Sequence, residues 1–285
     1  MADKITLLDG AMGTALWNIA EREGVAKDPV WKYNVEHPDF IAEITKQYVE
    51  AGSQIIQANT FGANKPSIKY FTDYEVEQVT RPAVQIAREA VKGTDVKVAV
   101  SVGPLTKLLK PYGDLSAEEC EEIFREQIGT AALEKPDLVT METFLDLEMI
   151  KIAAKVAKSY DLPVFCTLTF ERKCRTLMGN SVKQVCKELK NLGVDAVGMN
   201  CGLGPDKANE VIEQFREYSE LPVIYKPNAG MPVLNPDGSV QSAYTAEMFL
   251  EEVKPVLPYV SYMGGCCGSD PSFIATLRDY LKSQG

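Results

Sequence analysis

The sequence is short of histidine, of long apolar runs and of positive charge, and each shortage excludes a class of protein. His37 is the single histidine among 285 residues. A metal site built on several histidines and an H-E-x-x-H zinc motif are therefore excluded. A Ser-His-Asp or Cys-His pair would have to use His37, which precedes Pro38 at the predicted start of a helix. We expect this histidine to be an exposed loop residue.

The charge balance and the N-terminal sequence indicate which partners and which cellular location to expect. A net charge of −10 argues against nucleic acid as a partner and against an anionic membrane surface. No apolar run approaches the roughly 20 residues that span a bilayer, and the opening "MADKITLLDG" lacks the layout of a signal peptide. Seven cysteines, an odd number, do not form a secreted disulfide framework. We expect a cytoplasmic protein with reduced thiols.

Short apolar runs rich in β-forming residues recur along the chain, and each is followed by a segment with helical periodicity. Their near-continuous apolar character is typical of strands buried on both faces of a parallel sheet. Eight such units predict an α/β fold, the (β/α)₈ TIM barrel, with residues 1–285 as a single domain. A doubly wound sheet is the alternative, but "LLDGAMGT" lacks its G-x-G-x-x-G spacing. The runs begin at Ile5, Ser53, Val96, Asp137, Leu162, Val194, Leu221 and Tyr259.

Local signals define several boundaries. Apolar stripes predict helices over residues 38–51, which end at Gly52, and over residues 271–283. Hydroxyl and carboxylate pairs three residues apart predict capping boxes at Ser116 with Glu119 and at Thr72 with Glu75. The sequence "NPDGS" predicts a turn at residues 235–239.

Polar residues and cysteines follow the predicted strands, where a TIM barrel places its reactive groups. Barrel interiors favour branched apolar side chains, so packing explains these residues poorly. Cys120 and Cys186 fall in predicted helices, Cys166 in a strand and Cys174 in a loop, and we expect these four to be bystanders. The residues at the strand ends are Asp9, Asn59, Gly103, Glu142, Thr169, Cys201, Asn228, Cys266 and Cys267.

The adjacent cysteines in "YMGGCCGSD", residues 262–270, admit three interpretations. A glycine-rich turn after the eighth strand can bind a phosphate, which would explain the glycines but not the thiols. A disulfide between Cys266 and Cys267 would be strained and out of place in a reducing compartment. Alternatively, Cys201 joins them, because the sixth and eighth strands are second neighbours around a barrel. Three sulfur ligands select zinc and leave its fourth position open.

A three-thiolate zinc suits one kind of chemistry better than others. Thiolate ligands donate charge to the zinc ion and weaken it as a Lewis acid, so it activates bound water poorly. They suit binding of a further thiol, whose pKa falls from about 8.5 on the metal. The pattern therefore points to alkyl transfer onto sulfur.

Over nearly its whole length the sequence resembles the homocysteine S-methyltransferase family. Within that family it is most similar to the homocysteine-binding barrel of cobalamin-dependent methionine synthase, here as a stand-alone domain. The combination of "NCGLGP" with "GGCCG" is the specific part of the match. The motifs, in family order, are "LLDGAMGT", "ANTFGAN", "SVGP", "METFLDLEM", "LTF…RTLMGN", "GMNCGLGP", "PNAGMP" and "GGCCGSDP".

The resemblance implies a role for each matching residue. It implies zinc on Cys201, Cys266 and Cys267, with homocysteine sulfur as the exchangeable ligand. Asp9 and Gly10 match the loop that holds the amino-acid end of homocysteine, and Glu142 matches the carboxylate that pairs with its ammonium group. Asn228 lies where the methionine synthase barrel offers an amide oxygen as a fourth zinc ligand without substrate. Asn59 and Phe61 match residues that shape the pocket.

One departure from the family pattern concerns the acceptor. The family commonly has an acidic residue where this chain has Gln57. On a strand Gln57 and Asn59 face the same side, and if that side is the barrel mouth, the acceptor's ammonium has lost a possible partner. The acceptor would then be another thiol or a selenol.

The methyl donor is left open by the sequence. Methionine synthase carries folate and corrinoid domains after its barrel, and this sequence ends at Gly285 without them. We expect a methylcorrinoid protein to present the methyl group in trans. The alternatives are S-methylmethionine or S-adenosylmethionine, used by relatives of similar length, and betaine, whose users carry extra C-terminal sequence. A non-catalytic zinc- or thiol-binding subunit of a methyltransferase complex is a further alternative.

Overall fold

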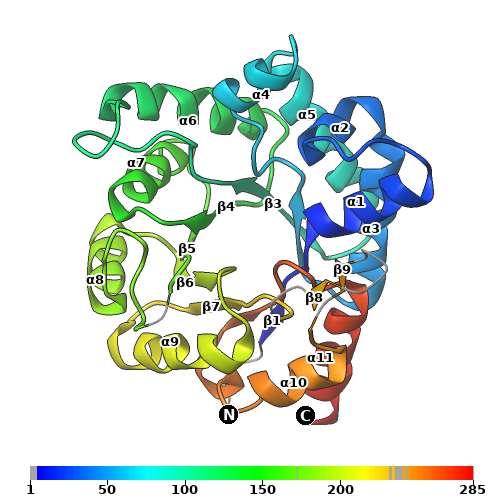
Figure 1. The fold of residues 1–285 in the computed structure, drawn as a ribbon, viewed down its shortest axis with the longest axis vertical. Coiled ribbons are helices and arrows are strands. Elements are labelled where there is room, and N and C mark those ends of the chain that lie inside the picture. Colours follow the sequence, from blue (N-terminus) through cyan, green and yellow to red (C-terminus); the bar gives the residue numbers. More distant parts are fainter. Residues whose placement is uncertain (1–4, 172, 231–232, 235–239, 242, 285) are drawn as a thin grey trace.

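Eight parallel strands form a barrel surrounded by helices (Figure 1). The computed structural model describes residues 5–171, 173–230, 233–234, 240–241 and 243–284. The barrel strands are β1 Thr6–Leu7, β2 Ile55–Ala58, β3 Lys97–Val102, β4 Leu138–Phe144, β5 Val164–Leu168, β6 Ala196–Asn200, β7 Val223–Lys226 and β10 Tyr262–Met263. The helices are α1 Met12–Arg22, α2 Tyr33–Glu36, α3 Pro38–Ala51, α4 Lys65–Phe71, α5 Val76–Ala90, α6 Ala117–Ala132, α7 Leu147–Lys158, α8 Val182–Leu192, α9 Pro205–Tyr218, α10 Ala246–Val253 and α11 Pro271–Ser283, with the 3-10 helices η1 Val30–Lys32 and η2 Leu257–Tyr259.

The strand order confirms the predicted (β/α)₈ barrel. The sheet runs β1-β10-β7-β6-β5-β4-β3-β2, and all seven pairings are parallel. A parallel bridge between Leu8 and Ile55 joins the two edge strands and closes the ring. All eight predicted apolar runs contain one of these strands.

Helix α3 shows how the sequence sets an element's limits. Pro38 occupies its first turn, where a missing N–H costs nothing, and Gly52 ends it in the left-handed conformation at φ 109°. Arg278 of α11 donates to the carbonyl of Ala51 at 3.0 Å, which places a cation at the negative end of the helix. The apolar stripe that predicted this helix is buried, with Phe40 and Ile44 among its members.

An apolar layer fills the barrel interior near the start of the strands. Each of the eight barrel segments contributes one residue to it, and the rings of Phe165 and Tyr262 lie 4.6 Å apart between centroids. This layer separates the mouth of the barrel from its opposite end. Its members are Leu8, Ile55, Ala99, Leu138, Phe165, Ala196, Ile224 and Tyr262.

Above this apolar layer the interior becomes polar. Side chains two positions apart on a strand share a face, so the next inward residues are those two positions farther along. On five strands these are Gln57, Ser101, Thr140, Thr167 and Lys226, four of which line a cavity with the apolar layer as its floor. Polar groups therefore occupy the barrel where a packed core would be apolar.

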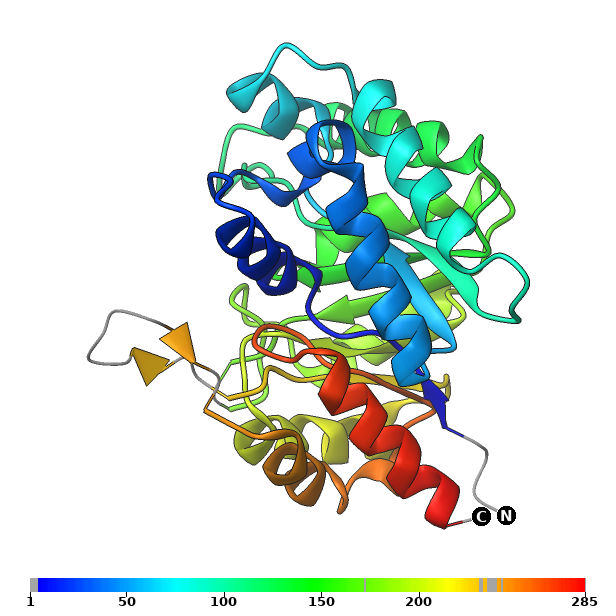
Figure 2. The same cartoon turned by 90° about the vertical axis from the view of Figure 1, so that its right-hand side faces the viewer.

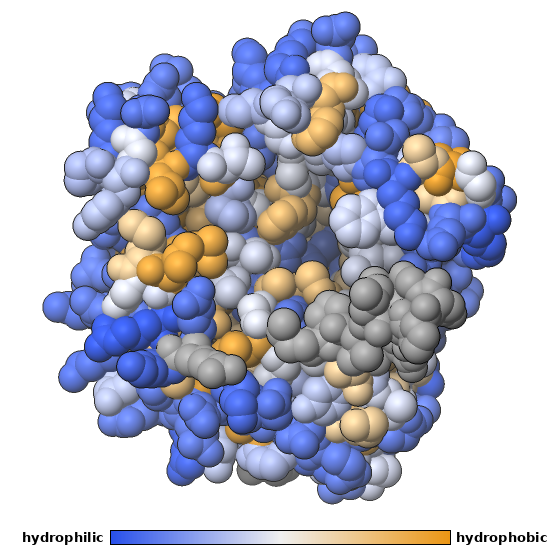
Figure 3. Space-filling model, in the orientation of Figure 1, coloured by the Kyte–Doolittle hydropathy of each residue, from blue (hydrophilic) through white to orange (hydrophobic). Residues whose placement is uncertain are grey.

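The carboxyl ends of the strands open onto one face of the molecule. In Figure 2 the antiparallel hairpin of β8 Val233–Leu234 and β9 Val240–Gln241 projects on the side away from the chain ends. Figure 3 shows this face hollowed at its centre, with hydrophilic and hydrophobic residues both present around the hollow. In the part of the chain that the structure describes, no helix has the length and apolar character needed to cross a membrane.

Three local predictions need comment. Ser116 and Glu119 form the predicted capping box of α6, but the box at Thr72 is wrong. Thr72 ends α4, and Glu75 itself caps α5 in a box with Gln78.

His37 is half-buried rather than exposed, since its ring stacks on Phe40 at 4.7 Å between centroids. The turn predicted at residues 235–239 lies outside the described residues.

Gly198 in β6 generates a stability prediction. A Cβ at this position would lie 1.9 Å from the backbone oxygen of Ile224 on the neighbouring strand, and a strand backbone cannot give way cheaply. We expect Gly198→Ala to lower the free energy of unfolding by about 1–3 kcal/mol, the usual cost of overpacking a core. Urea denaturation measures this change.

Gly13 in α1 is the matched control. A Cβ there would meet nothing within 4 Å. Gly13→Ala should leave the stability unchanged or raise it by about 0.5–1 kcal/mol, because alanine is the better helix former. Equal stability of the two variants would contradict the steric argument for Gly198.

Candidate metal centre and acceptor pocket

Three thiols converge at the mouth of the barrel. Cys201 follows β6, whereas Cys266 and Cys267 follow β10, and their sulfur atoms all lie within 4.8 Å of one another. The sulfur atoms of Cys201 and Cys267 are 3.8 Å apart. This excludes a disulfide between them, because a disulfide bond is about 2.05 Å long. All seven cysteines are free, so the predicted alternative of a vicinal disulfide is absent.

The segment that follows β7 holds the two cysteine loops together. Cys201 donates its backbone N–H to the carbonyl of Lys226 at 3.1 Å, and Cys266 donates to the carbonyl of Pro227 at 2.9 Å. In addition, Ala229 donates to the carbonyl of Cys267 at 2.9 Å. Because β7 lies between β6 and β10, residues 226–229 connect loops that are separated by more than 60 positions in the sequence.

Two residues at the site have left-handed backbones although neither is glycine. Cys201 has φ 59° and Thr143, directly after Glu142, has φ 62°. Such conformations cost about 1–3 kcal/mol and persist where the surroundings determine them. Here they turn the chain at the end of a strand, so that Cys201 and Glu142 are presented at the mouth.

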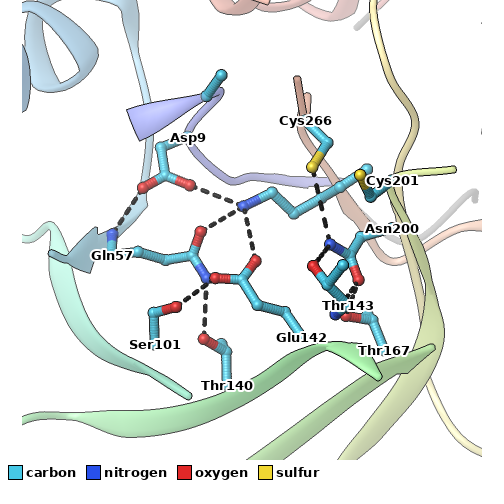
Figure 4. Close-up of polar contacts among 12 residues, drawn as sticks. Asp9, Gln57, Ser101, Thr140, Glu142, Thr143, Thr167, Asn200, Cys201 and Cys266 are labelled. Atoms are coloured by element: carbon cyan, nitrogen blue, oxygen red, sulfur yellow. Dashed lines mark hydrogen bonds and ion pairs between the residues drawn. The ribbon is translucent and has the colours of Figure 1, made fainter. Parts of the chain in front are cut away.

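Asn200 links the thiols to the neighbouring strands (Figure 4). Its Oδ1 accepts hydrogen bonds from the Thr143 backbone N–H and the Thr167 hydroxyl, each at 2.7 Å. Its Nδ2 donates to the Thr143 hydroxyl at 2.7 Å and to Cys266 Sγ at 3.7 Å. The amide is completely buried. It therefore fixes the left-handed turn at Thr143 and orients the Cys266 sulfur with one side chain.

The contacts among the thiols act in both directions, but together with burial they raise the pKa of each thiol. The contact with Cys201, together with burial, raises the pKa of Cys266 to about 12. Cys266 lowers the pKa of Cys201, but the contact with Cys267 and burial outweigh this effect and raise it to about 11. Without a cation the three sulfurs therefore do not become thiolates together near neutral pH.

The trio fits a tetrahedral zinc ion. Two thiolate sulfurs at about 2.3 Å from one tetrahedral zinc lie about 3.8 Å apart, which is the separation of Cys201 and Cys267. Asn228 Oδ1 supports the fit, because it is buried and has no hydrogen-bond partner among the described residues. The Asn228 backbone N–H donates to the carbonyl of Leu203 at 3.0 Å, and the next residue, Ala229, donates to the carbonyl of Cys267 at 2.9 Å, so the backbone of Asn228 lies between the two cysteine loops. Three soft thiols and an orphaned amide oxygen are a donor set for zinc.

A buried charge cluster lies beneath the trio. Lys226 Nζ is 2.9 Å from Asp9 Oδ1 and 4.0 Å from Glu142 Oε2, and it also donates to Gln57 Oε1. Asp9 Oδ2 accepts the Gln57 backbone N–H at 2.7 Å, and Glu142 accepts a hydrogen bond from the Ser101 hydroxyl. Figure 4 shows Asp9, Gln57 and Glu142 pointing toward the same space. This cluster is where the resemblance placed the acceptor's amino-acid end.

The predicted pocket residues occupy different positions. Gly10 cannot take a side chain, since a Cβ would lie 2.7 Å from the Tyr48 hydroxyl and 2.8 Å from Ser269 Oγ. Phe61 packs on Gly103, where a Cβ would lie 2.6 Å from its ring. Both predicted roles remain untested.

Asn59 has a structural explanation. Its Nδ2 donates to the carbonyl of Val30 and to Asn34 Oδ1, both at 2.8 Å. These bonds tie β2 to the segment before α3 rather than to the trio. A role for Asn59 in binding the acceptor therefore stays a prediction without structural support. The four remaining cysteines are buried away from the trio, as expected of bystanders.

Sequence reasoning missed Lys226 and Asn200. The signal was nevertheless present, because both interrupt apolar strands at positions where the side chain alternates inward: "AVGMN" ends in Asn200 and "VIYK" in Lys226. A lysine at the end of a strand that is buried on both faces needs a buried anion. Attention to strand ends alone selected Cys201, which follows Asn200, and Asn228, which lies two residues after Lys226.

Comparison with known proteins identifies the family. A family model described as homocysteine S-methyltransferase matches residues 6–281. The chain belongs to this family. It is 29% identical over 297 residues to methionine synthase of Mycobacterium leprae (strain TN), and 28% identical over 294 residues to methionine synthase of Mycobacterium tuberculosis (strain ATCC 25618 / H37Rv). These matches cover 96% of this chain but 24% of the relatives.

A solved structure of similar fold comes from Escherichia coli. The metallated form of the homocysteine methyltransferase MmuM superposes with a TM-score of 0.79 at 23% identity, over 99% of this chain and 97% of that one. Its apo form gives a TM-score of 0.75 at 23% identity, over 97% and 96%. At this level of identity the similarity establishes the barrel fold.

The role of Asn200 generates the second prediction. Asn200→Ala removes the acceptor of the buried Thr143 N–H and should lower the free energy of unfolding by about 1–3 kcal/mol. Thr167→Val deletes one donor to the same amide and should cost less, about 0.5–1.5 kcal/mol. Guanidinium denaturation compares the two variants. Wild-type stability of Asn200→Ala would show that this amide does not hold the turn.

Proposed function

We propose that this chain is a zinc-dependent thiol S-methyltransferase that converts homocysteine to methionine. The methyl group comes from a methylcorrinoid presented to the barrel mouth by a separate protein. The observation that carries the proposal is the trio of Cys201, Cys266 and Cys267, whose sulfur atoms all lie within 4.8 Å of one another. The family and the two methionine synthase relatives support homocysteine as the acceptor.

Different residues of the chain would face the two ends of the acceptor. Bound zinc would supply a thiolate form of the acceptor sulfur at neutral pH. Asn228 Oδ1, which is buried and has no hydrogen-bond partner among the described residues, would be the fourth zinc ligand without the acceptor and would be replaced by its sulfur. Glu142, with a side chain 13% exposed, faces the other end of the acceptor. Holding the acceptor sulfur at the metal, with the rest of the acceptor in the cavity below, aligns that sulfur with a methyl carbon that arrives at the open mouth.

The transfer itself needs no protein group as acid or base. The acceptor sulfur forms a bond to the methyl carbon, and the electron pair of the broken bond stays on the donor. The proton of the acceptor thiol passes to solvent water at the open mouth when the thiolate forms. This fits a mouth in which His37, the single histidine, lies outside the site at the junction of α2 and α3.

Zinc retention provides the third prediction. Cys201→Ala, Cys266→Ala and Cys267→Ala should each lose zinc on dialysis and lose turnover, because two thiolates leave the metal half-liganded. Mass spectrometry of the purified protein measures its zinc content, and this measurement does not depend on activity. Cys174→Ala is the control, since this buried cysteine is not in the trio and should keep its zinc. A trio variant that keeps both zinc and turnover would refute the site.

Methionine formation provides the fourth prediction and tests the function directly. The zinc-loaded protein should form methionine from homocysteine with free methylcobalamin as the sole donor. Failure with methylcobalamin but turnover with S-methylmethionine or S-adenosylmethionine would place the chain among sulfonium users. Failure with every donor, despite zinc on the trio, would favour a non-catalytic zinc-binding subunit.

A further inference from the structure

The ammonium group of Lys226 lies inside the barrel, within the proposed acceptor pocket. The residue is 4% exposed, and its Nζ is 2.9 Å from Asp9 Oδ1 and 4.0 Å from Glu142 Oε2. Its contact with Asp9 favours the protonated form, because a neutral amine would leave the buried Asp9 carboxylate without its cation. The group is therefore a permanent cation at neutral pH.

Lys226 forms an ion pair with Asp9, one of the two carboxylates in the proposed acceptor pocket. Asp9 is 1% exposed, and each of its oxygens already has a partner, Lys226 Nζ for Oδ1 and the Gln57 N–H for Oδ2. The ammonium group of a ligand would therefore have to compete with Lys226 for this buried carboxylate. The predicted role of Asp9 in holding homocysteine stays a prediction.

Glu142, with a side chain 13% exposed, is the more accessible carboxylate for an acceptor's ammonium, and its setting is unfavourable. One oxygen accepts from Ser101, and the other is 4.0 Å from Lys226. An ammonium group bound to that second oxygen would lie beside the lysine cation, and like charges in a site of low dielectric repel strongly. Gln57, neutral and bonded to Lys226 and Thr140, adds no compensating negative charge.

We propose that Lys226 determines which acceptors the pocket selects. Its ammonium group occupies the place beside Asp9 and Glu142 that the α-ammonium of an amino-acid acceptor would otherwise fill. The pocket then accepts mercaptocarboxylic acids without an α-amino group as readily as amino-acid thiols. This inference rests on the proposed thiol-binding function of the trio. It extends that function by predicting that homocysteine is not distinguished by its amino group.

Thiol binding to the cobalt(II)-substituted protein tests the inference without turnover. The sulfur-to-cobalt absorption band reports ligation by the trio, and its change on adding a thiol gives a dissociation constant. The two probes are homocysteine and 4-mercaptobutanoate, which differ only in the α-amino group. In the wild-type protein the two constants should agree within about threefold, whereas a charge-assisted ammonium contact would separate them by about tenfold or more.

Two variants locate the effect. Lys226→Met removes the cation with little change in length, and Gln57→Glu adds a carboxylate while keeping the lysine, which provides a second route if the first variant does not fold. Each should shift the ratio of constants about tenfold toward homocysteine. Lys187→Met, on the exposed surface of α8, is the matched control and should leave the ratio unchanged.

The outcomes separate this inference from the proposed function. A wild-type preference for homocysteine above about tenfold would overturn the inference. So would an unchanged ratio in the folded Lys226→Met or Gln57→Glu protein. Failure of the trio to bind cobalt, or of any thiol to alter its spectrum, would overturn the proposed function and the inference together.

Discussion

The site depends on the backbone hydrogen bonds made by residues 226–229. Cys201 and the Cys266–Cys267 pair leave different strands, and no contact local in sequence could bring their sulfurs within 4.8 Å. The carbonyls of Lys226 and Pro227 accept from Cys201 and Cys266 because β7 lies between β6 and β10. Pro227 has no N–H of its own, so it serves only as an acceptor here. The spacing of the thiols is thus a property of strand order.

The apolar floor makes the charge cluster above it possible. The layer that includes Phe165 and Ile224 closes the barrel below the site, so the polar side chains above it are shielded from water on that side. A buried cation is costly unless it is paired. The contact of Lys226 with Asp9 at 2.9 Å meets that condition. Gly264 leaves room for it, since a Cβ there would lie 3.4 Å from Lys226 Cγ and 2.6 Å from the Asp9 carbonyl oxygen.

The sequence predicted the fold because strands buried on both faces are recognisable as apolar runs, and each of the eight runs contains a barrel strand. It predicted the cysteine trio because thiols at strand ends have no packing explanation. It could not predict which way each polar side chain turns. Asn59 directly follows β2 and Glu142 lies near the end of β4, yet Asn59 bonds outward to Val30 while Glu142 faces the cluster. Thr72 failed as a cap because α4 extends to Phe71, so that only Glu75 is free to begin α5.

The balance of charge connects the trio to the cluster below it. With neutral thiols the site holds two carboxylates and one ammonium and therefore carries a net negative charge. Three thiolates and a dication would add one further negative charge, and an acceptor thiolate would add another. Lys226 is the cation that offsets this growing charge, and the Cys266 sulfur is among the groups that raise its pKa. The same ammonium repels a second cation placed beside Glu142. A single lysine can therefore favour thiolate at one end of the pocket while weakening recognition of an amino group at the other.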